Sequence, residues 1–220
     1  MKKMVLILLF VYVCAGEAVA REEGFYLELG LGYSYHENVG LGFLVETRGW
    51  YVGAGAGFSL WAGGEWTVSL GVNIDFLIDP EIEFLRGEAH YQVENTGRGA
   101  SLRILPYLQF SRQMSDAVFM GFGVGYGFNN IFFGMRPLLY DVDFTSWQLS
   151  TNSVTPMLFI RVFPFWGSFY FSINYEADIV INGEIRRLLG DPFTGVNDIS
   201  GLRDFHGVHH RARLVIGFSI

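Results

Sequence analysis

Residues 66–78 alternate between large apolar side chains and small or polar ones, with the exception of Leu77. One set of alternate positions carries Trp66, Val68, Leu70, Val72, Ile74, Phe76 and Ile78, and the other carries Thr67, Ser69, Gly71, Asn73 and Asp75. Successive side chains of a β-strand point to opposite faces, so the two sets face opposite sides of a sheet. A long apolar face opposite a small, polar face is typical of a strand with lipid outside and a polar lumen inside.

Seven further segments repeat this pattern, and each has about 11 residues, the length of a tilted strand that crosses a bilayer. We predict eight strands, at residues 25–35, 50–60, 66–78, 101–111, 117–128, 154–163, 169–179 and 208–220. Short connections near 61–65, 112–116 and 164–168 alternate with long ones near 37–49, 79–100, 129–153 and 180–207. The pattern predicts an all-β, eight-stranded, antiparallel up-and-down transmembrane barrel with long extracellular loops.

A soluble β-sandwich is the main competing fold, because its strands also alternate. The outer face of a sandwich meets water and is polar, whereas glycine dominates the second face of this chain. No segment after residue 20 is a run of about 18 apolar residues, so no helix is predicted to span a membrane. The net charge of −7 predicts no surface for binding nucleic acid.

The first 20 residues have the three parts of a secretory signal peptide. Two lysines precede the apolar run 4–15, and the small-x-small site Ala18-Val19-Ala20 follows it. The apolar run is shorter than the roughly 20 residues of a membrane-spanning helix. We therefore predict a signal peptide at 1–20 and one barrel domain at 21–220.

Cys14 is the only cysteine of the chain. A lipoprotein signal would make Cys14 the first residue of the mature protein, but bulky Val13 stands before it where such a signal resembles a small-residue motif. Cleavage after Ala20 instead removes the cysteine. The mature chain then has neither disulfides nor a cysteine-ligated metal site.

The C-terminal segment 214–220, with the sequence Leu-Val-Ile-Gly-Phe-Ser-Ile, is the most specific part of the pattern. Together with the strand pattern over the whole mature chain, it resembles the small eight-stranded outer-membrane barrel families of OmpA, OmpW and the opacity proteins. In those families the last strand ends in an aromatic residue that the assembly machinery reads as an insertion signal. This chain ends in Ile220, so we expect Phe218, two places earlier on the same face, to replace the terminal aromatic residue.

This resemblance implies an outer-membrane location, with membrane lipid and the barrel assembly machinery as partners. The likeness to OmpW also implies a hydrophobic pocket for small lipophilic molecules. We expect an apolar loop to form the mouth of that pocket, with the residues Ile131, Phe132, Phe133, Leu138 and Leu139. The expected function is a narrow or closed barrel that passes or binds small hydrophobic molecules, with no cofactor and no metal.

The inward face of the predicted barrel carries four acids and four arginines. They are Glu28, Asp75, Arg103, Arg161, Glu176, Asp178, Arg211 and Arg213. Eight strands enclose a lumen just wide enough for side chains or one small ligand. Burial favours pairing of opposite charges, so we predict a salt-bridged plug that either serves stability alone or gates a narrow path. Inward glycines leave further space, which large inward side chains fill or which remains a cavity.

Two other functions stay open at this point. The long loops could act as an adhesin or surface antigen toward host surface molecules, with the barrel as their anchor. Alternatively, His206, His209 and His210 lie near Asp204 and could supply the general base of a lipid-modifying enzyme. No serine is well placed beside these histidines, and nothing resembles a nucleophile elbow. We therefore do not expect an enzyme.

Overall fold

The computed structural model describes residues 24–40, 43–86, 89–91, 100–135, 145–164, 168–189 and 203–219. These residues form nine strands: β1 (Gly24–Gly40), β2 (Phe43–Gly63), β3 (Trp66–Arg86), β4 (Ala89–Tyr91), β5 (Ala100–Ser115), β6 (Val118–Met135), β7 (Thr145–Val162), β8 (Phe169–Leu189) and β9 (His206–Ser219). Across the described ranges, no helix is long and apolar enough to cross a membrane.

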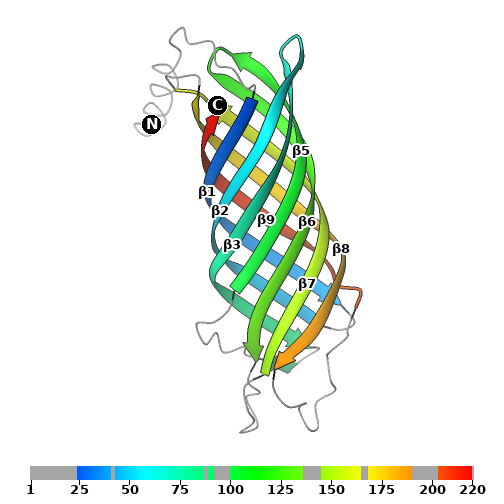
Figure 1. Cartoon of the computed structure of the whole chain (residues 1–220). Helices are drawn as coiled ribbons and strands as arrows, with labels where there is room; N and C mark the ends of the chain where they lie inside the picture. The colour runs from blue at the N-terminus through cyan, green and yellow to red at the C-terminus, as the bar shows by residue number, and fades with distance from the viewer. Residues whose placement is uncertain are drawn as a thin grey trace, which may run out of the picture.

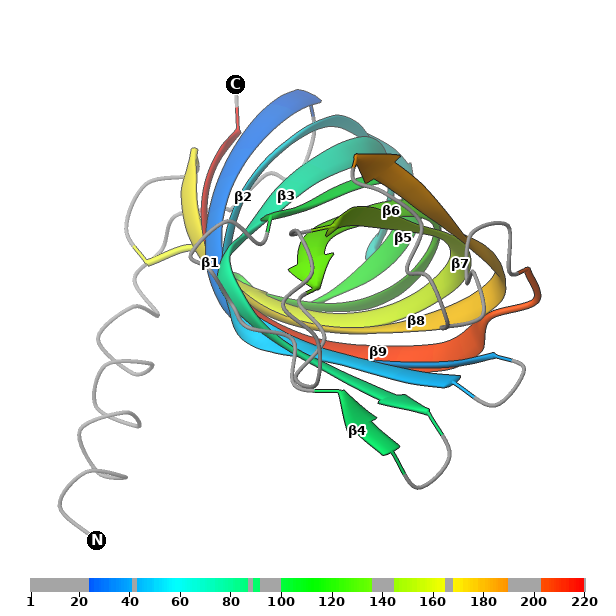
Figure 2. The same cartoon turned by 90° about the horizontal axis from the view of Figure 1, so that it is seen from below.

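Eight of these strands close into an antiparallel barrel, which confirms the predicted fold. Each strand pairs with the next along the chain, β3 pairs with β5, and β9 pairs with β1 to close the ring. The short β4 pairs with the end of β3 and lies outside the ring (Figure 2). Figure 1 shows the strong tilt of the strands, with the start of β1 and the end of β9 at the same, upper end of the barrel. We call this end the turn end, and the opposite end the loop end.

The barrel strands are longer than the sequence pattern predicts. They contain between 14 and 21 residues, and most of the added length lies at the loop end. The predicted long loop at 37–49 is wrong, because β1 extends to Gly40, β2 begins at Phe43, and the two strands pair in this region, with Glu37 opposite Glu46. Most of the described part of 79–100 likewise belongs to β3 and β4. The alternation between apolar and polar residues is weaker in these loop-end extensions, because both faces of a strand can be polar where water replaces lipid.

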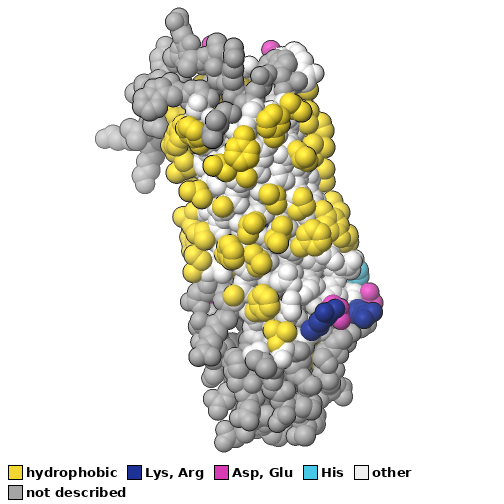
Figure 3. All heavy atoms as spheres, viewed as in Figure 1, with side chains coloured by type: hydrophobic (Ala, Val, Ile, Leu, Met, Phe, Trp, Pro, Cys, Tyr) yellow, Lys and Arg dark blue, Asp and Glu magenta, His cyan; other side chains and the backbone are white. Residues whose placement is uncertain are grey.

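The outer wall of the barrel carries a broad apolar belt (Figure 3). All eight barrel strands contribute large apolar side chains to it, and Leu29, Leu70 and Ile173 are exposed by 69%, 66% and 63%. A water-soluble domain rarely exposes so large an apolar surface, whereas hydrocarbon solvates it well. Aromatic side chains such as Trp66 and Trp50 lie toward the two ends of the belt, as in barrels that span a bilayer. The belt is therefore the membrane-spanning surface.

The outer wall becomes charged beyond this belt at the loop end. Tyr33 pairs with Trp50 in one of the last apolar rows, and Glu37, Arg48 and Glu81 follow on the same outward face. Arg48 Nε lies 2.6 Å from Glu81 Oε2, and both side chains are at least half exposed. A 21-residue strand tilted by about 40° covers roughly 50 Å along the axis, against about 30 Å of hydrocarbon. The barrel thus continues past the bilayer into water.

Candidate functional site in the barrel lumen

All eight charged residues predicted to face inward lie in the lumen, and none is more than 3% exposed. They form two groups at different depths. The charged layer comprises Asp75, Arg103, Glu176, Asp178, Arg211 and Arg213, and the remaining pair, Glu28 and Arg161, lies nearer the turn end.

Arg103 is the centre of the charged layer. Its Nη1 donates to Asp75 Oδ2 at 3.0 Å and to Glu176 Oε2 at 2.6 Å, and its Nη2 donates to Asp178 Oδ1 at 2.5 Å. Asp75 is the register partner of Arg103 on the neighbouring β3. Glu176 and Asp178, however, lie on β8, which β6 and β7 separate from β5. The guanidinium of Arg103 therefore joins opposite walls of the barrel across the lumen.

Two arginines of β9 complete the charged layer. Arg211 lies 3.4 Å from Asp178 and 3.7 Å from Asp75, and Arg213 lies 3.7 Å from Asp75. Three guanidinium groups thus face three carboxylates, those of the two aspartates and of Glu176. Such a balance is needed because an unpaired charge inside a barrel has a large desolvation penalty.

A layer of tyrosines surrounds the second ion pair nearer the turn end. Arg161 Nη2 lies 3.6 Å from Glu28 Oε1, and the Tyr170 hydroxyl donates to the same oxygen at 2.9 Å. The Arg161 guanidinium also lies 4.8 Å from the centre of the Tyr170 ring, a cation–π arrangement. Tyr26 and Tyr107 join their hydroxyl groups at 2.9 Å in the same region. Aromatic rings and one ion pair therefore occupy the lumen on the turn-end side of the charged layer.

Large inward side chains lie directly over the inward glycines. The Tyr26 ring covers Gly57, and a Cβ added there would overlap both the ring and a backbone carbonyl of β3. The Arg213 guanidinium covers Gly30 in the same way. These glycines are thus sites of close approach by a neighbouring group. At these positions, side chains fill the space that the glycines leave.

The predicted hydrophobic mouth is wrong as a loop. Ile131, Phe132 and Phe133 lie within β6, because the alternation of this strand continues past its predicted end at residue 128. Ile131 and Phe133 point inward and are almost fully buried, whereas Phe132 lies on the opposite face and is partly exposed. The other two predicted mouth residues, Leu138 and Leu139, lie outside the described residues.

Ile131 and Phe133 belong instead to an apolar layer inside the loop end of the barrel. We call it the outer apolar layer, and it comprises Val45, Ile131, Phe133, Trp147, Leu149, Ile185 and Phe205, each at most 3% exposed. Ile131, Leu149 and Ile185 are register partners across β6, β7 and β8. The sequence signal for this layer is that apolar residues continue to occupy the inward positions of the strands beyond their predicted ends.

The three histidines near Asp204 do not converge on one site. His209 points into the lumen, where its ring stacks on that of His36 with 4.2 Å between the centroids. His206 and His210 lie on the exposed outer face. The structure adds His36, which the sequence analysis did not single out although it occupies the next inward position of β1 after Ser34. Among the described residues, no group of three or more His, Cys, Asp or Glu side chains is arranged to hold a metal ion.

The two predicted sequence signals at the chain ends remain predictions. Phe218 lies on the outward face of β9, half exposed and paired with Phe169 of β8. Ile220 and the predicted signal peptide at 1–20, including Cys14, lie outside the described residues.

The sequence matches no family model and no curated protein. Solved structures similar to this barrel include the attachment invasion locus protein Ail of Yersinia pestis, at 12% identity and a TM-score of 0.43, over 90% of this chain and 99% of that one. Neisserial surface protein A is similar at 9% identity and a TM-score of 0.48, over 90% and 97%. A major outer-membrane protein of Thermus thermophilus is similar at 13% identity and a TM-score of 0.45, over 88% and 99%.

Proposed function

We propose that this protein is a closed outer-membrane barrel that does not conduct ions and that presents its loop end at the cell surface for recognition. The observation that carries this proposal is the position of Arg103, which joins β5 to β3 and β8 through the middle of the lumen. The tyrosine layer on one side and the outer apolar layer on the other add two further obstructions.

The strand extension beyond the apolar belt supports a role at the surface. Paired strands continue through the charged region that holds Arg48 and Glu81, so a rigid sheet carries the loop end away from the bilayer. Surface loops held by a rigid scaffold are common sites of recognition.

Planar-bilayer recording tests the closed state. We expect the wild-type protein to produce no conductance steps, because buried ion pairs and aromatic rings lie across the lumen. The charge-balanced variant Arg103→Ala with Glu176→Ala removes the central bridge and should produce steps. Its matched control, Arg112→Ala with Glu65→Ala, removes an exposed ion pair at 2.8 Å between β5 and the β2–β3 turn and should produce no conductance steps. Conductance by the wild-type protein would contradict the proposal.

A second candidate function is the binding of small hydrophobic molecules within the outer apolar layer. This layer supports the candidate because its apolar side chains lie between the loop end and the charged layer, which would stop an apolar molecule from passing further. Ligand sites in small barrels are typically lined by apolar side chains at the mouth. The same protein would then be a receptor for lipophilic molecules at its loop end.

Fluorescence of N-phenyl-1-naphthylamine, an apolar probe, tests this second candidate. Trp147 is a large, fully buried member of the layer, and Trp147→Ala should leave a cavity that accepts the probe. We expect binding roughly tenfold tighter than to the wild-type protein, since apolar cavities bind apolar ligands. Trp66→Ala on the lipid-facing wall is the control. Equal affinities for all three proteins would rule out binding within this layer.

A further inference from the structure

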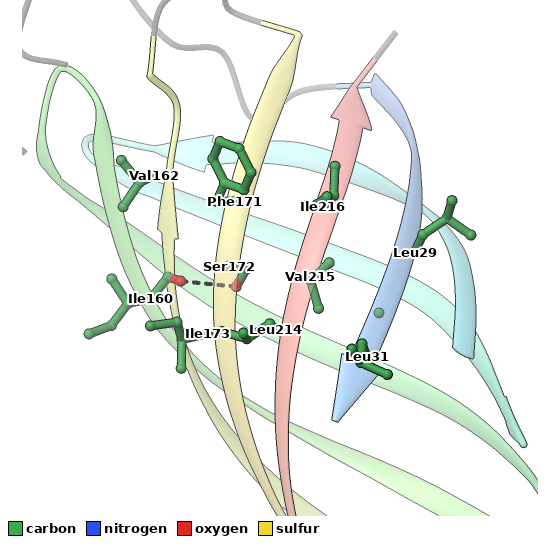
Figure 4. A pocket seen from close by; sticks show the side chains of 11 residues that line it. Leu29, Leu31, Ile160, Val162, Phe171, Ser172, Ile173, Leu214, Val215 and Ile216 are labelled. Atoms are coloured by element: carbon green, nitrogen blue, oxygen red, sulfur yellow. Dashed lines mark hydrogen bonds between the residues drawn. The ribbon is translucent and has the colours of Figure 1, made fainter. Parts of the chain in front are cut away.

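The apolar belt contains a groove of about 680 Å³ on its outer surface, across β7, β8, β9 and β1 (Figure 4). It lies on the lipid-facing side of the wall, separate from the lumen. Strand register explains its shape, because two rows of outward side chains cross the four strands in parallel. The first row is Ile160, Ile173, Leu214 and Leu31, and the second is Val162, Phe171, Ile216 and Leu29.

The floor of the groove is the backbone between these two rows. Ser172, Val215 and Gly30 are register partners on β8, β9 and β1, and they take the inward positions of their strands. The rows are two residues apart, which corresponds to about 6.7 Å along a strand. Four strands with about 4.8 Å between neighbours make the groove roughly 14 Å long. Its dimensions therefore match an extended, unbranched chain.

The lining of the groove offers no polar contact to such a chain. Ser172 is the single polar residue of the lining, and its hydroxyl donates to the Ile160 carbonyl at 2.9 Å (Figure 4). The other lining residues are glycine or carry hydrocarbon side chains. An occupant would make van der Waals contacts alone, at carbon–carbon separations of about 3.5–4.0 Å. These properties suit saturated hydrocarbon.

We propose that the groove holds one acyl chain of a membrane lipid, which lies across the four strands. The groove is continuous with the membrane-spanning belt, so hydrocarbon is the medium that surrounds it. Both of its walls are unbroken, whereas the next row toward the loop end contains Ala212 between Tyr33 and Tyr175. The gap at this alanine leaves the neighbouring groove with a lower wall. A chain in the proposed groove thus contacts side chains on both sides along its length.

Photolabelling in vesicles tests this proposal. The protein is reconstituted in phosphatidylethanolamine containing a lipid with a diazirine in the middle of one acyl chain, and labelled residues are located by mass spectrometry after irradiation. Ile173 and Leu214, both 63% exposed, form the groove wall, and Leu70, 66% exposed, is the control on another face. Ile173 and Leu70 are each the fifth residue of their strands. We expect about threefold more label in the groove, as a small number of added van der Waals contacts would produce.

Variants with smaller side chains in the groove wall distinguish binding in the groove from general contact with lipid. Ile173→Ala with Leu214→Ala should reduce label on the remaining groove residues to the average of the belt, whereas Leu70→Ala should leave the groove label unchanged. Equal labelling of Leu70 and the groove in the wild-type protein would overturn the proposal. Crosslinking of a second copy at Ile173 in place of lipid would also overturn it. Label on Leu70 reports that the barrel lies in the bilayer, so failure of the groove is distinguishable from failure of the proposed membrane location.

Discussion

Replacement of Arg103 by methionine should lower the free energy of unfolding by about 3–5 kcal/mol, the range for removing one partner of a buried ion pair. The substitution leaves Asp75, Glu176 and Asp178 facing one another without the guanidinium that contacts all three. Two arginines of β9 remain, but they lie 3.4 Å or more from these carboxylates. Urea unfolding of the protein in lipid vesicles, followed by tryptophan fluorescence, measures the change.

Arg112→Met is the matched control for this experiment. Arg112 forms an ion pair with Glu65 at 2.8 Å, but both side chains are more than half exposed. Exposed pairs contribute about 0–1 kcal/mol, so this variant should unfold near the wild-type urea concentration. Adding Glu176→Gln to Arg103→Met should restore part of the lost stability, because it removes one of the unpaired acids. Equal midpoints for Arg103→Met and the control would show that the charged layer contributes little to stability.

Gly57→Val should lower the free energy of unfolding by about 3 kcal/mol, the upper end of the range for overpacking a filled interior. The Tyr26 ring and the Leu70 carbonyl occupy the space that the new side chain needs. Displacement of Tyr26 would also break its hydrogen bond with Tyr107. The same urea titration measures the effect.

Ala54→Val provides the control on the same strand. Ala54 lies three residues before Gly57 and faces outward toward lipid, so added methyl groups meet fluid hydrocarbon. We expect a change in stability below about 0.5 kcal/mol, as for substitutions away from packed features. If Gly57→Val were as stable as Ala54→Val, the lumen would have more free space than the structure indicates.

The barrel itself could be predicted because lipid on one side and side chains on the other impose a strict period of two. Residues 66–78 illustrate this, since every outward position carries a large apolar side chain. The same rule failed where water replaces lipid. Glu37 and Glu46 face each other across β1 and β2, yet neither marks a strand by hydrophobicity. The sequence therefore predicts strands that end several residues short of their observed limits at the loop end.

The lumen was predictable in composition but not in its contacts. The alternation of inward and outward residues along each strand is enough to assign Arg103 and its three acids to the interior. The choice of partner depends on which residues come to the same depth on strands that do not pair, such as β5 and β8. That depth depends on the stagger of the whole barrel. The sequence does not predict the outer apolar layer for a related reason, because its pattern assigns Ile131 and Phe133 to a loop, whereas they lie in β6.

The bridge through Arg103 ties charge balance in the lumen to closure of the barrel. Asp75 meets Arg103 as soon as β3 and β5 pair, because the two residues are register partners. Glu176 and Asp178 lie on β8, which faces Arg103 across the lumen only where β6 and β7 complete the curved wall between β5 and β8. A half-built sheet therefore keeps mismatched charges that the finished ring neutralises. The network is therefore complete only in the closed barrel.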